Sequence, residues 1–509
     1  MDLKLDAPSA QHPRADCSSH SLVGVSQSNP NGRTLPVDDP LHKRLCDAVQ
    51  AVITEYGHVP QDESLEGSGP HIQHVEGAFN HVYIVTISAT RMVFRLPRSP
   101  ARYRQNEPAA EALDSHVQTL EAIHSSSTIT MLPVPTVYDH SSVACGPLKR
   151  FPLGSPFIAM SYIDGVRASD LWNHGTEDAR RAFISNSAKA IGTLVQILRY
   201  PSFGALSMNP DNNTSVTVVP RFVRSRDRIE RVENTLMDDE TKETVYEFLS
   251  RNKLWEAPDA PNPSDLVIDS LMQDIVNNLP CGPTEQNSEP FALFPPNLDL
   301  DHILVDRNLQ GCITGFLDWE LASLEPDFVC YGRLPDWLHT SDGSCIYGWP
   351  GDDMKQKSET EARLFEYQQI YSNAVAQAIA NKRFETEYAS MNSEKRRDSG
   401  YVEGRRNEVL AKAQEMVRRG HVQAWVWDMM RTPKRRRAVC TKIFENCVDL
   451  DSGAMGTSEI TDLGNCQRPG TTGSEQDKRH KVEQILQRWS GIVGGKDLHA
   501  CGIRQHIGR

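Results

Sequence analysis

The residues best suited to chemistry are two acids, each of which ends a short apolar segment. Residues 304–306 read LVD, and after a turn residues 313–320 read ITGFLDWE. A hairpin of this kind presents a carboxylate at the mouth of a cleft, and Asp318 needs a partner if it is buried. A divalent cation is one such partner, because Mg²⁺ needs only one or two protein carboxylates beside phosphate oxygens. The alternative is that Asp318 only caps a turn or a helix.

Six segments in a defined order extend this pattern. They are EGAFNHVY (76–83), MVFRLPR (92–98), LPVPTVY (132–138), PFIAMSYIDG (156–165), PPNLDLDHILVD (295–306) and ITGFLDWE (313–320). Together they resemble the aminoglycoside phosphotransferase family, in particular its large fungal branch. That family is similar to protein kinases, so the resemblance implies an α+β, two-lobed protein-kinase-like fold. A small β-rich N-lobe and a large, mainly α-helical C-lobe would hold ATP between them.

The resemblance assigns the nucleotide-binding residues. Gly77 and Asn80 belong to the turn over the phosphates, where a backbone without a side chain can approach an anion and donate N–H groups. Arg95 stands where kinases carry a lysine for the α- and β-phosphates, and its planar fork suits phosphate. Met160 and Tyr162 lie on the hinge strand that pairs with adenine. The alternatives are an ordinary β-turn glycine and a solvated strand arginine.

The helix after Arg95 is expected to offer that cation a partner. The aligned position is His116, with Glu111 and Asp114 on nearby turns. A histidine can accept a hydrogen bond but brings no negative charge at neutral pH. Glu320, two residues after Asp318, is expected to support the metal or the structure of its loop.

The catalytic loop departs from the family pattern. The sequence places Asn297 where the family has its catalytic Asp, and His302 where it has a metal-binding Asn. Asn297 has no basic lone pair for the substrate proton, although it can orient a hydroxyl group. His302 suits Mn²⁺ or Zn²⁺ better than Mg²⁺. Asp299 or Asp301 could replace the missing base, and Asp299 is the better candidate.

The function that follows is ATP-dependent phosphorylation of a hydroxyl group on an unidentified small-molecule acceptor. Mg²⁺, or Mn²⁺ in its place, would be held by Asp318 and His302. Without the catalytic Asp this activity is expected to be weak or lost. The alternative is a non-catalytic pseudokinase that binds a nucleotide or a partner. A third interpretation is an unrelated α+β scaffold with coincidental motifs.

Hydrophobic periodicity predicts the elements that position these residues. Residues 71–98 read as two or three strands, and residues 107–124 as a helix. One face of that helix carries Leu113, Val117, Leu120 and Ile123. Strands follow near 132–140 and 156–165. Thr176 can cap the next helix, whose apolar stripe comprises Ile184, Ala188, Ile191, Val195 and Leu198. Residues 204–285 read as irregular connections between shorter helices. Residues 291–318 read as strand–loop–strand–turn–strand. Two further segments, 358–385 and 406–447, are predicted to be helical.

These elements divide the chain into four parts. They are an N-terminal extension (1–64), disordered to about residue 38 with a short helix near 41–56; an N-lobe and hinge (65–165); a helical C-lobe (166–450); and a linker with a terminal helix (451–509). The linker spans 452–479, and the terminal helix spans 481–489.

Composition limits the class of partner. The 509 residues hold 54 Lys and Arg against 67 Asp and Glu, a formal net charge of −13. This net negative charge argues against nonspecific, sequence-independent nucleic-acid binding. The sequence contains no apolar run of membrane-spanning length and no signal-like N-terminal apolar segment, so we expect a cytoplasmic protein. The 11 cysteines show no metal-like spacing and read as free thiols.

Two weaker signals are interpreted as structural. His71, His74 and His81 resemble metal ligands, but the odd spacing of His71 and His74 points them to opposite faces of a strand. We therefore expect no site there. The basic runs 395–397 and 434–437 are interpreted as solvated helix faces or loops.

Overall fold

In this computed structural model, the structure describes twelve stretches of the chain. They are residues 33–56, 70–87, 90–98, 107–126, 132–141, 153, 155–209, 212–225, 228–232, 291–295, 298–339 and 359–429. Asn297, the basic run 434–437, the predicted linker and the predicted terminal helix lie outside these residues.

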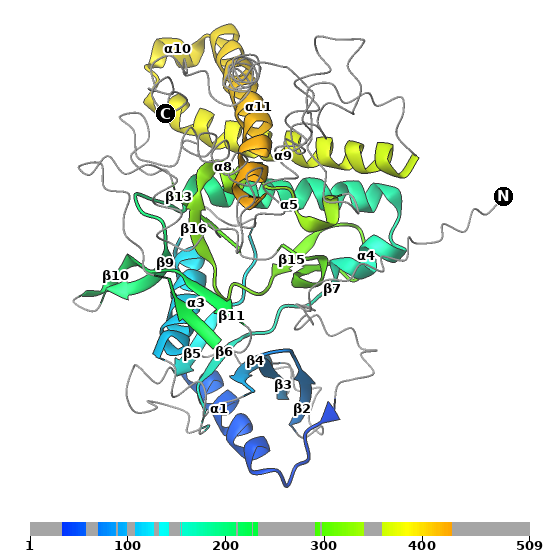
Figure 1. The fold of residues 1–509 in the computed structure, drawn as a ribbon, viewed down its shortest axis with the longest axis vertical. Coiled ribbons are helices and arrows are strands. Elements are labelled where there is room, and N and C mark those ends of the chain that lie inside the picture. The colour runs from blue at the N-terminus through cyan, green and yellow to red at the C-terminus, as the bar shows by residue number, and fades with distance from the viewer. Residues whose placement is uncertain are drawn as a thin grey trace, which may run out of the picture.

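The N-terminal part is built on a six-stranded antiparallel sheet with the order β1-β2-β3-β4-β6-β5 (Figure 1). Its strands are β1 (Arg33–Thr34), β2 (His71–Glu76), β3 (Asn80–Ile87), β4 (Thr90–Pro97), β5 (Val137–Ser141) and β6 (Phe157–Ser161). The strands predicted between residues 71 and 98 are confirmed as β2, β3 and β4. The prediction of disorder to residue 38 is wrong for β1, because Arg33 and Thr34 pair with His74 and Gln73.

Two helices cover the two faces of this sheet, because strand side chains alternate between faces. Helix α1 (Pro40–Tyr56), predicted near 41–56, packs on the face that carries Ile72, Tyr83 and Phe94. Helix α3 (Glu107–Ser125) packs through Leu113 and Val117 on the face that carries Val82 and Val93. Arg95 follows Val93 by two residues and therefore shares the face of α3.

The C-terminal part of the described chain is mainly helical. Its helices are α4 (Ala168–His174), α5 (Glu177–Ile197), α8 (Asp327–Gly332), α9 (Glu359–Ser390), α10 (Ser393–Arg397) and α11 (Ser399–Met429). Thr176 caps α5 as predicted, since its hydroxyl oxygen accepts from the Ala179 N–H at 3.2 Å. The predicted apolar stripe of α5 is buried, and α5 packs on α9, which packs on α11 (Figure 1).

Two small sheets connect these helices to the N-terminal sheet. One has the order β16-β13-β8 and the other β15-β14-β7. Their strands are β7 (Val166–Arg167), β8 (Arg199–Tyr200), β13 (Phe291–Phe294), β14 (Ile303–Val305), β15 (Ile313–Phe316) and β16 (Ser323–Pro326). The predicted strand–loop–strand–turn–strand pattern over 291–318 is confirmed. Its β14–β15 hairpin ends two residues before Asp318.

The prediction of irregular connections between short helices over 204–285 is wrong at its start. The structure has two hairpins there, made of β9 (Ala205–Asn209), β10 (Asn212–Val219), β11 (Phe222–Ser225) and β12 (Arg228–Arg231). Alternating Thr and Val in β10 is a strand signal, because β-branched side chains favour extended backbone. Ala109 and Ala112 of α3 pack against Ala205, Phe222 and Ile229 of these hairpins.

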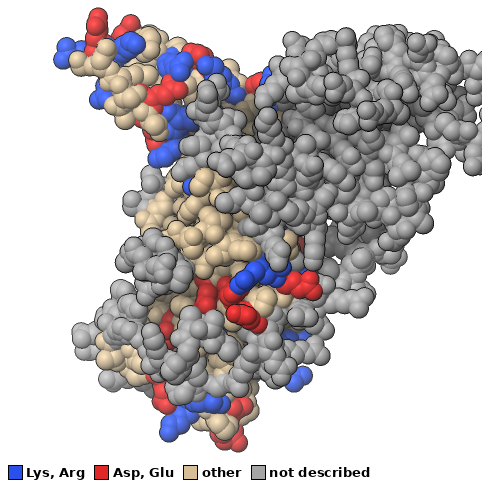
Figure 2. Space-filling model, turned by 60° about the vertical axis from the view of Figure 1, so that its left-hand side comes forward, with Lys and Arg blue, Asp and Glu red and all other residues tan. Residues whose placement is uncertain are grey.

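Together the sheets and helices confirm a mixed α+β class. Among the described helices, none combines the length and the apolar character needed to cross a bilayer. Figure 2 shows basic and acidic side chains interspersed at the upper end of the molecule, where α10 and α11 lie. The basic run 395–397 sits in α10 and is exposed; Lys395 lies over the ring of Tyr401 in α11 and Arg396 over the ring of Tyr388 in α9. The described cysteines Cys46, Cys312 and Cys330 are free thiols.

The closest backbone approach in the helical part predicts a stability difference. A Cβ on Gly332 of α8 would overlap the carbonyl oxygen of Gly420 in α11, whereas a Cβ on Gly404 of α11 would meet nothing within 4 Å. Overpacking typically costs about 1–3 kcal/mol, so Gly332→Ala should lower the free energy of unfolding by that amount. Gly404→Ala is the matched control and should raise it by up to about 1 kcal/mol. Urea unfolding measures both, and equal stabilities would contradict the packing described here.

Candidate functional site

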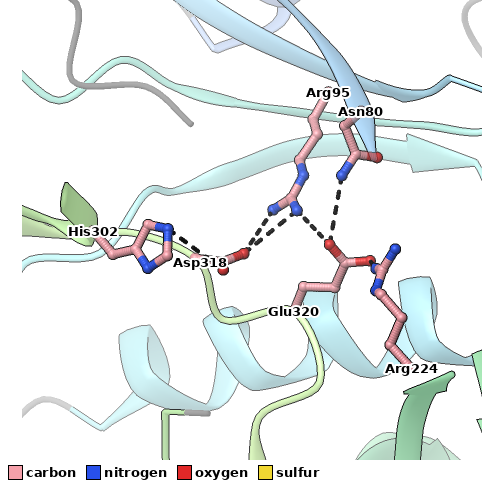
Figure 3. A network of polar contacts seen from close by, with 6 residues as sticks. All are labelled: Asn80, Arg95, Arg224, His302, Asp318 and Glu320. Carbon is pink, nitrogen blue, oxygen red and sulfur yellow. Dashed lines mark hydrogen bonds and ion pairs between the residues drawn. The ribbon is translucent and has the colours of Figure 1, made fainter. Parts of the chain in front are cut away.

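Arg95 and Asp318 meet where the β14–β15 hairpin faces the N-terminal sheet. Arg95 extends from β4, and its Nη1 and Nη2 atoms each lie 3.4 Å from Asp318 Oδ1 (Figure 3). Asp318 itself is in the left-handed backbone region, with a φ of 56°, and Leu321 has a φ of 65°. Non-glycine residues persist in this region where surrounding contacts hold them, often at functional sites. The acid that the sequence singles out therefore has a cationic partner more than 200 residues away.

Glu320 is the second acid of this cluster and lies between two arginines. Its Oε2 atom accepts from Arg95 and its Oε1 atom accepts from Arg224 of β11 (Figure 3). The Glu320 side chain is only 14% exposed. Burial alone would raise the pKa of Glu320, but Arg95 and Arg224 outweigh burial and hold that pKa below its ordinary value. Glu320 is therefore a charged carboxylate shared by β4 and β11.

Asn80 adds a neutral group to the same cluster. In one amide orientation its Nδ2 donates to Glu320 Oε2 at 3.5 Å, as Figure 3 draws it. In the other orientation its Oδ1 accepts from Arg95 Nε and Nη2, at 2.9 Å each. The second orientation is favoured, because it offers the Arg95 guanidinium an acceptor, whereas the first turns the amide NH₂ towards the guanidinium donors. Asn80 then helps to hold Arg95 in position.

His116 lies beneath Arg95 on α3 and is buried. Burial, with a smaller contribution from the charge of Arg95, lowers the pKa of His116 to about 4, so the imidazole is neutral near pH 7. The two acids on nearby turns are engaged elsewhere: Glu111 pairs with Arg231, and Asp114 lies 3.6 Å from His140. The carboxylates that pair with Arg95 in the described part of the chain are those of Asp318 and Glu320, which lie outside α3.

His302 faces Asp318 from the side opposite Arg95. Its Nε2 atom lies 3.8 Å from Asp318 Oδ2, and its carbonyl oxygen accepts from the Leu317 N–H at 2.8 Å (Figure 3). The side chain is buried, and its Nδ1 atom has no hydrogen-bond partner among the residues that the structure describes. The two residues predicted to bind a metal are therefore adjacent, and together they offer carboxylate oxygen and imidazole nitrogen.

The two candidate replacement bases differ in their surroundings. Asp301 accepts from the Ser169 hydroxyl at 2.6 Å and lies 3.9 Å from Arg167, so it holds the loop to the start of α4. Asp299 precedes the 3₁₀ turn Leu300–His302, and among the described residues its carboxylate has no hydrogen bond or ion pair. Of the two acids, Asp299 keeps its lone pairs available.

The turn between β2 and β3 differs from the predicted phosphate-binding turn. The Gly77 N–H is not free for an anion, because it donates to the Asn80 carbonyl oxygen at 2.9 Å and closes the turn. Phe79, at the tip, lies against Arg224, whose guanidinium carbon is 3.9 Å from the ring centroid. A cation over an aromatic face is favourable, so Arg224 holds both the turn and Glu320.

A pocket adjoins this cluster on the side of β6. Its lining comprises Val82, Val93, Arg95, His116, Leu120, Pro135, Met160, Ser161, Ile163, Leu304, Leu317, Asp318 and Trp319. Four residues singled out from the sequence are among them. Tyr162 is not; it lies under Arg91, and the adjacent Ser161 and Ile163 face the pocket instead. An apolar pocket with a few convergent polar groups is the usual form of a small-molecule site.

Arg224 is the part of the site that sequence reasoning missed. It lies in the segment 204–285 that was interpreted as irregular, and no motif surrounds it. Its position depends on the pairing of β11 with β12 and on the packing of this hairpin against α3. The β-branched residues of β10 could have indicated strands here, but no local signal could have indicated the contact with Glu320.

Comparison with solved structures gives low-level likenesses to phosphotransferases. A Ralstonia eutropha JMP134 protein taken to be an aminoglycoside phosphotransferase shares 13% identity over 74% of this chain and 98% of its own, with a TM-score of 0.34. Aminoglycoside phosphotransferase APH(4)-Ia shares 12% over 72% and 98%, with a TM-score of 0.33. Macrolide 2'-phosphotransferase type I shares 11% over 74% and 99%, with a TM-score of 0.26. These scores are too low to carry an argument about this chain.

Comparison with sequence families adds nothing to these likenesses. No family model and no curated protein matches the chain.

The shared carboxylate of Glu320 predicts a large effect of its removal. Glu320→Gln leaves the largely buried Arg224 without its anion and Arg95 with Asp318 alone, and breaking a buried ion pair typically costs about 3–5 kcal/mol. Glu111→Gln is the matched control, because its pair with Arg231 is partly exposed and worth at most about 1 kcal/mol. Urea unfolding near neutral pH measures both, and similar losses in the two variants would contradict the buried network.

The stability that Glu320 contributes should decrease at acidic pH. The pKa of Glu320 is lower in the folded protein than its ordinary value of 4.5. Its contribution to stability is therefore complete above 4.5 and is lost as the pH falls towards the folded pKa. The difference in unfolding free energy between wild type and Glu320→Gln should shrink over that range. A difference that stays constant down to the lowest pH at which the wild type remains folded would contradict this assignment.

Proposed function

We propose that the chain is a two-lobed, kinase-like protein related in function to the aminoglycoside phosphotransferases, and that it binds ATP in the pocket beside Arg95. The observation that carries the proposal is the meeting of Arg95 with Asp318 at this pocket. Phosphoryl transfer needs a fixed cation for the phosphates and a carboxylate for the metal, placed on opposite sides of one cleft. Arg95 and Asp318 come from the two parts of the chain to which the family resemblance assigns these roles.

The residues of the site suit a nucleotide on one side and a metal on the other. Met160 and the neighbouring residues of β6 form the apolar wall proposed for adenine, and Arg95 is the proposed phosphate ligand. His116, being neutral, adds no charge that would repel Arg95. Asp318 and His302 would hold the divalent ion, whose role is to neutralise phosphate charge. A mixed oxygen and nitrogen donor set favours Mn²⁺ over Mg²⁺.

Catalysis is proposed to be weak. The family resemblance puts Asn297 at the position of the general base, and loss of such a base costs about 10²–10⁴-fold in rate. Asp299 is the substitute base proposed here, because its carboxylate is not engaged by a described neighbour. The acceptor is proposed to be a small molecule with a free hydroxyl group, and the protein is proposed to be cytoplasmic.

The second candidate function, a non-catalytic nucleotide-binding protein, is favoured by the charge balance of the cluster. Two guanidinium groups, Arg95 and Arg224, face two carboxylates, Asp318 and Glu320, so these four charges cancel. A polyanionic nucleotide that enters must bring its own cation or displace an acid from Arg95. A cluster whose charges already cancel can stabilise the fold at least as well as it can support catalysis.

The first test is ATP binding, which this charge balance predicts to depend on a divalent metal. ATP with Mn²⁺ or Mg²⁺ should raise the thermal midpoint of the wild type, since a ligand at 100 times its Kd stabilises by about 2.7 kcal/mol. Arg95→Gln should abolish the shift. Arg199→Gln is the matched control, because it breaks a similarly buried pair with Asp327 away from the pocket and should keep the shift. A wild type that no nucleotide shifts would exclude both candidate functions.

The second test separates a weak enzyme from a non-catalytic binder. If the rest of the machinery is intact, Asn297→Asp should raise ATP turnover by about 10²–10⁴-fold, measured as ADP release with water as the acceptor. Asp318→Asn in the Asn297→Asp background should remove the gain, and Asp299→Ala in the wild type should remove residual turnover. Unchanged turnover in an Asn297→Asp variant that still binds ATP would favour the non-catalytic candidate.

A further inference from the structure

Two histidines and a glutamate converge on the face of the sheet opposite Arg95. His74 and Glu76 are two residues apart on β2 and so share a face, and the register places His81 of β3 directly opposite Glu76. This is the face covered further along by α1. The Nε2 atom of His74 lies 3.1 Å from Nδ1 of His81, and one ligand atom from each of the three residues lies within 4.8 Å of the others.

These distances are close to those of a metal site. Zinc binds imidazole nitrogen at about 2.0–2.1 Å in tetrahedral geometry, which separates two ligand atoms by about 3.3 Å. The His74 and His81 nitrogens therefore need to move by only a few tenths of an ångström to share one ion. Glu76 is 58% exposed, and its contact with Arg98 is long at 3.8 Å, so its carboxylate can turn towards the histidines.

The surroundings hold the imidazoles in place and neutral. The ring of Tyr83, the next residue along the same face of β3, stacks on His74 with centroids 4.7 Å apart and planes 12° apart. Partial burial lowers the pKa of both His74 and His81, so both rings keep a lone pair near neutral pH. A hydrogen bond between two neutral imidazoles is the simplest use of such a pair, but it does not involve the nearby carboxylate of Glu76.

We propose that His74, Glu76 and His81 bind a divalent metal ion of the zinc type, separate from the Asp318 site. Two imidazole nitrogens and one carboxylate oxygen form a donor set suited to Zn²⁺ or Co²⁺ and poorly suited to Mg²⁺ or Ca²⁺. Three protein ligands leave a fourth position for water. The ion would join β2 to β3 just before the turn that carries Phe79 and Asn80, and so fix that turn.

The sequence argument at this place rested on His71 and His74 alone. His71 and His74 do point to opposite faces, as their odd spacing predicts, and His71 pairs across the sheet with Thr86. The site arises instead from His81, which the β2–β3 register brings beside His74. His71 is exposed, lies on the same strand and is outside the cluster, so it is a natural control.

The test is titration of the untagged wild-type protein with Co²⁺, followed by visible d–d absorption. His74→Ala and His81→Ala should each weaken the binding that produces these bands by at least about tenfold, since loss even of a residue that only supports a ligand costs 10–100-fold. His71→Ala should leave the binding unchanged. Glu76→Gln should also weaken it, and this exposed substitution does not threaten folding.

Three results would overturn the proposal. The first is absence of the d–d bands in the wild type at millimolar Co²⁺. The second is equal binding by wild type, His74→Ala and His81→Ala, which would place the ion elsewhere. The third is binding that Glu76→Gln leaves intact, which would reduce the site to a histidine pair. Nucleotide binding enters none of these measurements, so the result does not depend on the proposed function.

Discussion

The pairing of the largely buried Glu320 carboxylate with two arginines is the interaction on which the arrangement of the site depends. It accepts from Arg95 on β4 and from Arg224 on β11, and it follows Asp318 by two residues. Three segments far apart in the chain are thereby held by one group. A buried charge is tolerated only when its partners surround it, and here each guanidinium also has a second neighbour: Asp318 for Arg95 and Phe79 for Arg224.

This network bears on the proposed kinase-like function. In the kinase pattern the strand cation pairs with a carboxylate from the helix that follows it, whereas here that helix presents neutral His116. The anion comes instead from the segment after β15, next to the proposed metal ligand. The cation proposed for phosphate and the acid proposed for metal are thus linked directly, so a nucleotide that binds as proposed must rearrange the ion pairs of the site.

The β2–β3 hairpin contributes to both faces of the N-terminal sheet. Asn80 contacts Arg95 on one face, and His74, Glu76 and His81 gather on the other. The turn between these strands is closed by its own backbone hydrogen bond and is held at its tip by Arg224. An ion on the outer face would therefore act on the same turn that borders the proposed nucleotide site.

The sequence by itself determined the class of fold, most of the elements and the identity of Arg95, His116, Asp318 and His302 as a set. Periodicity and caps are local, and the apolar stripes of α3 and α5 are visible in the sequence because burial selects them. The tertiary structure alone decided which charges meet. The pairing of Glu320 with Arg224, and of His74 with His81, depends on strand register and on packing between distant segments, and neither leaves a trace in local residue spacing.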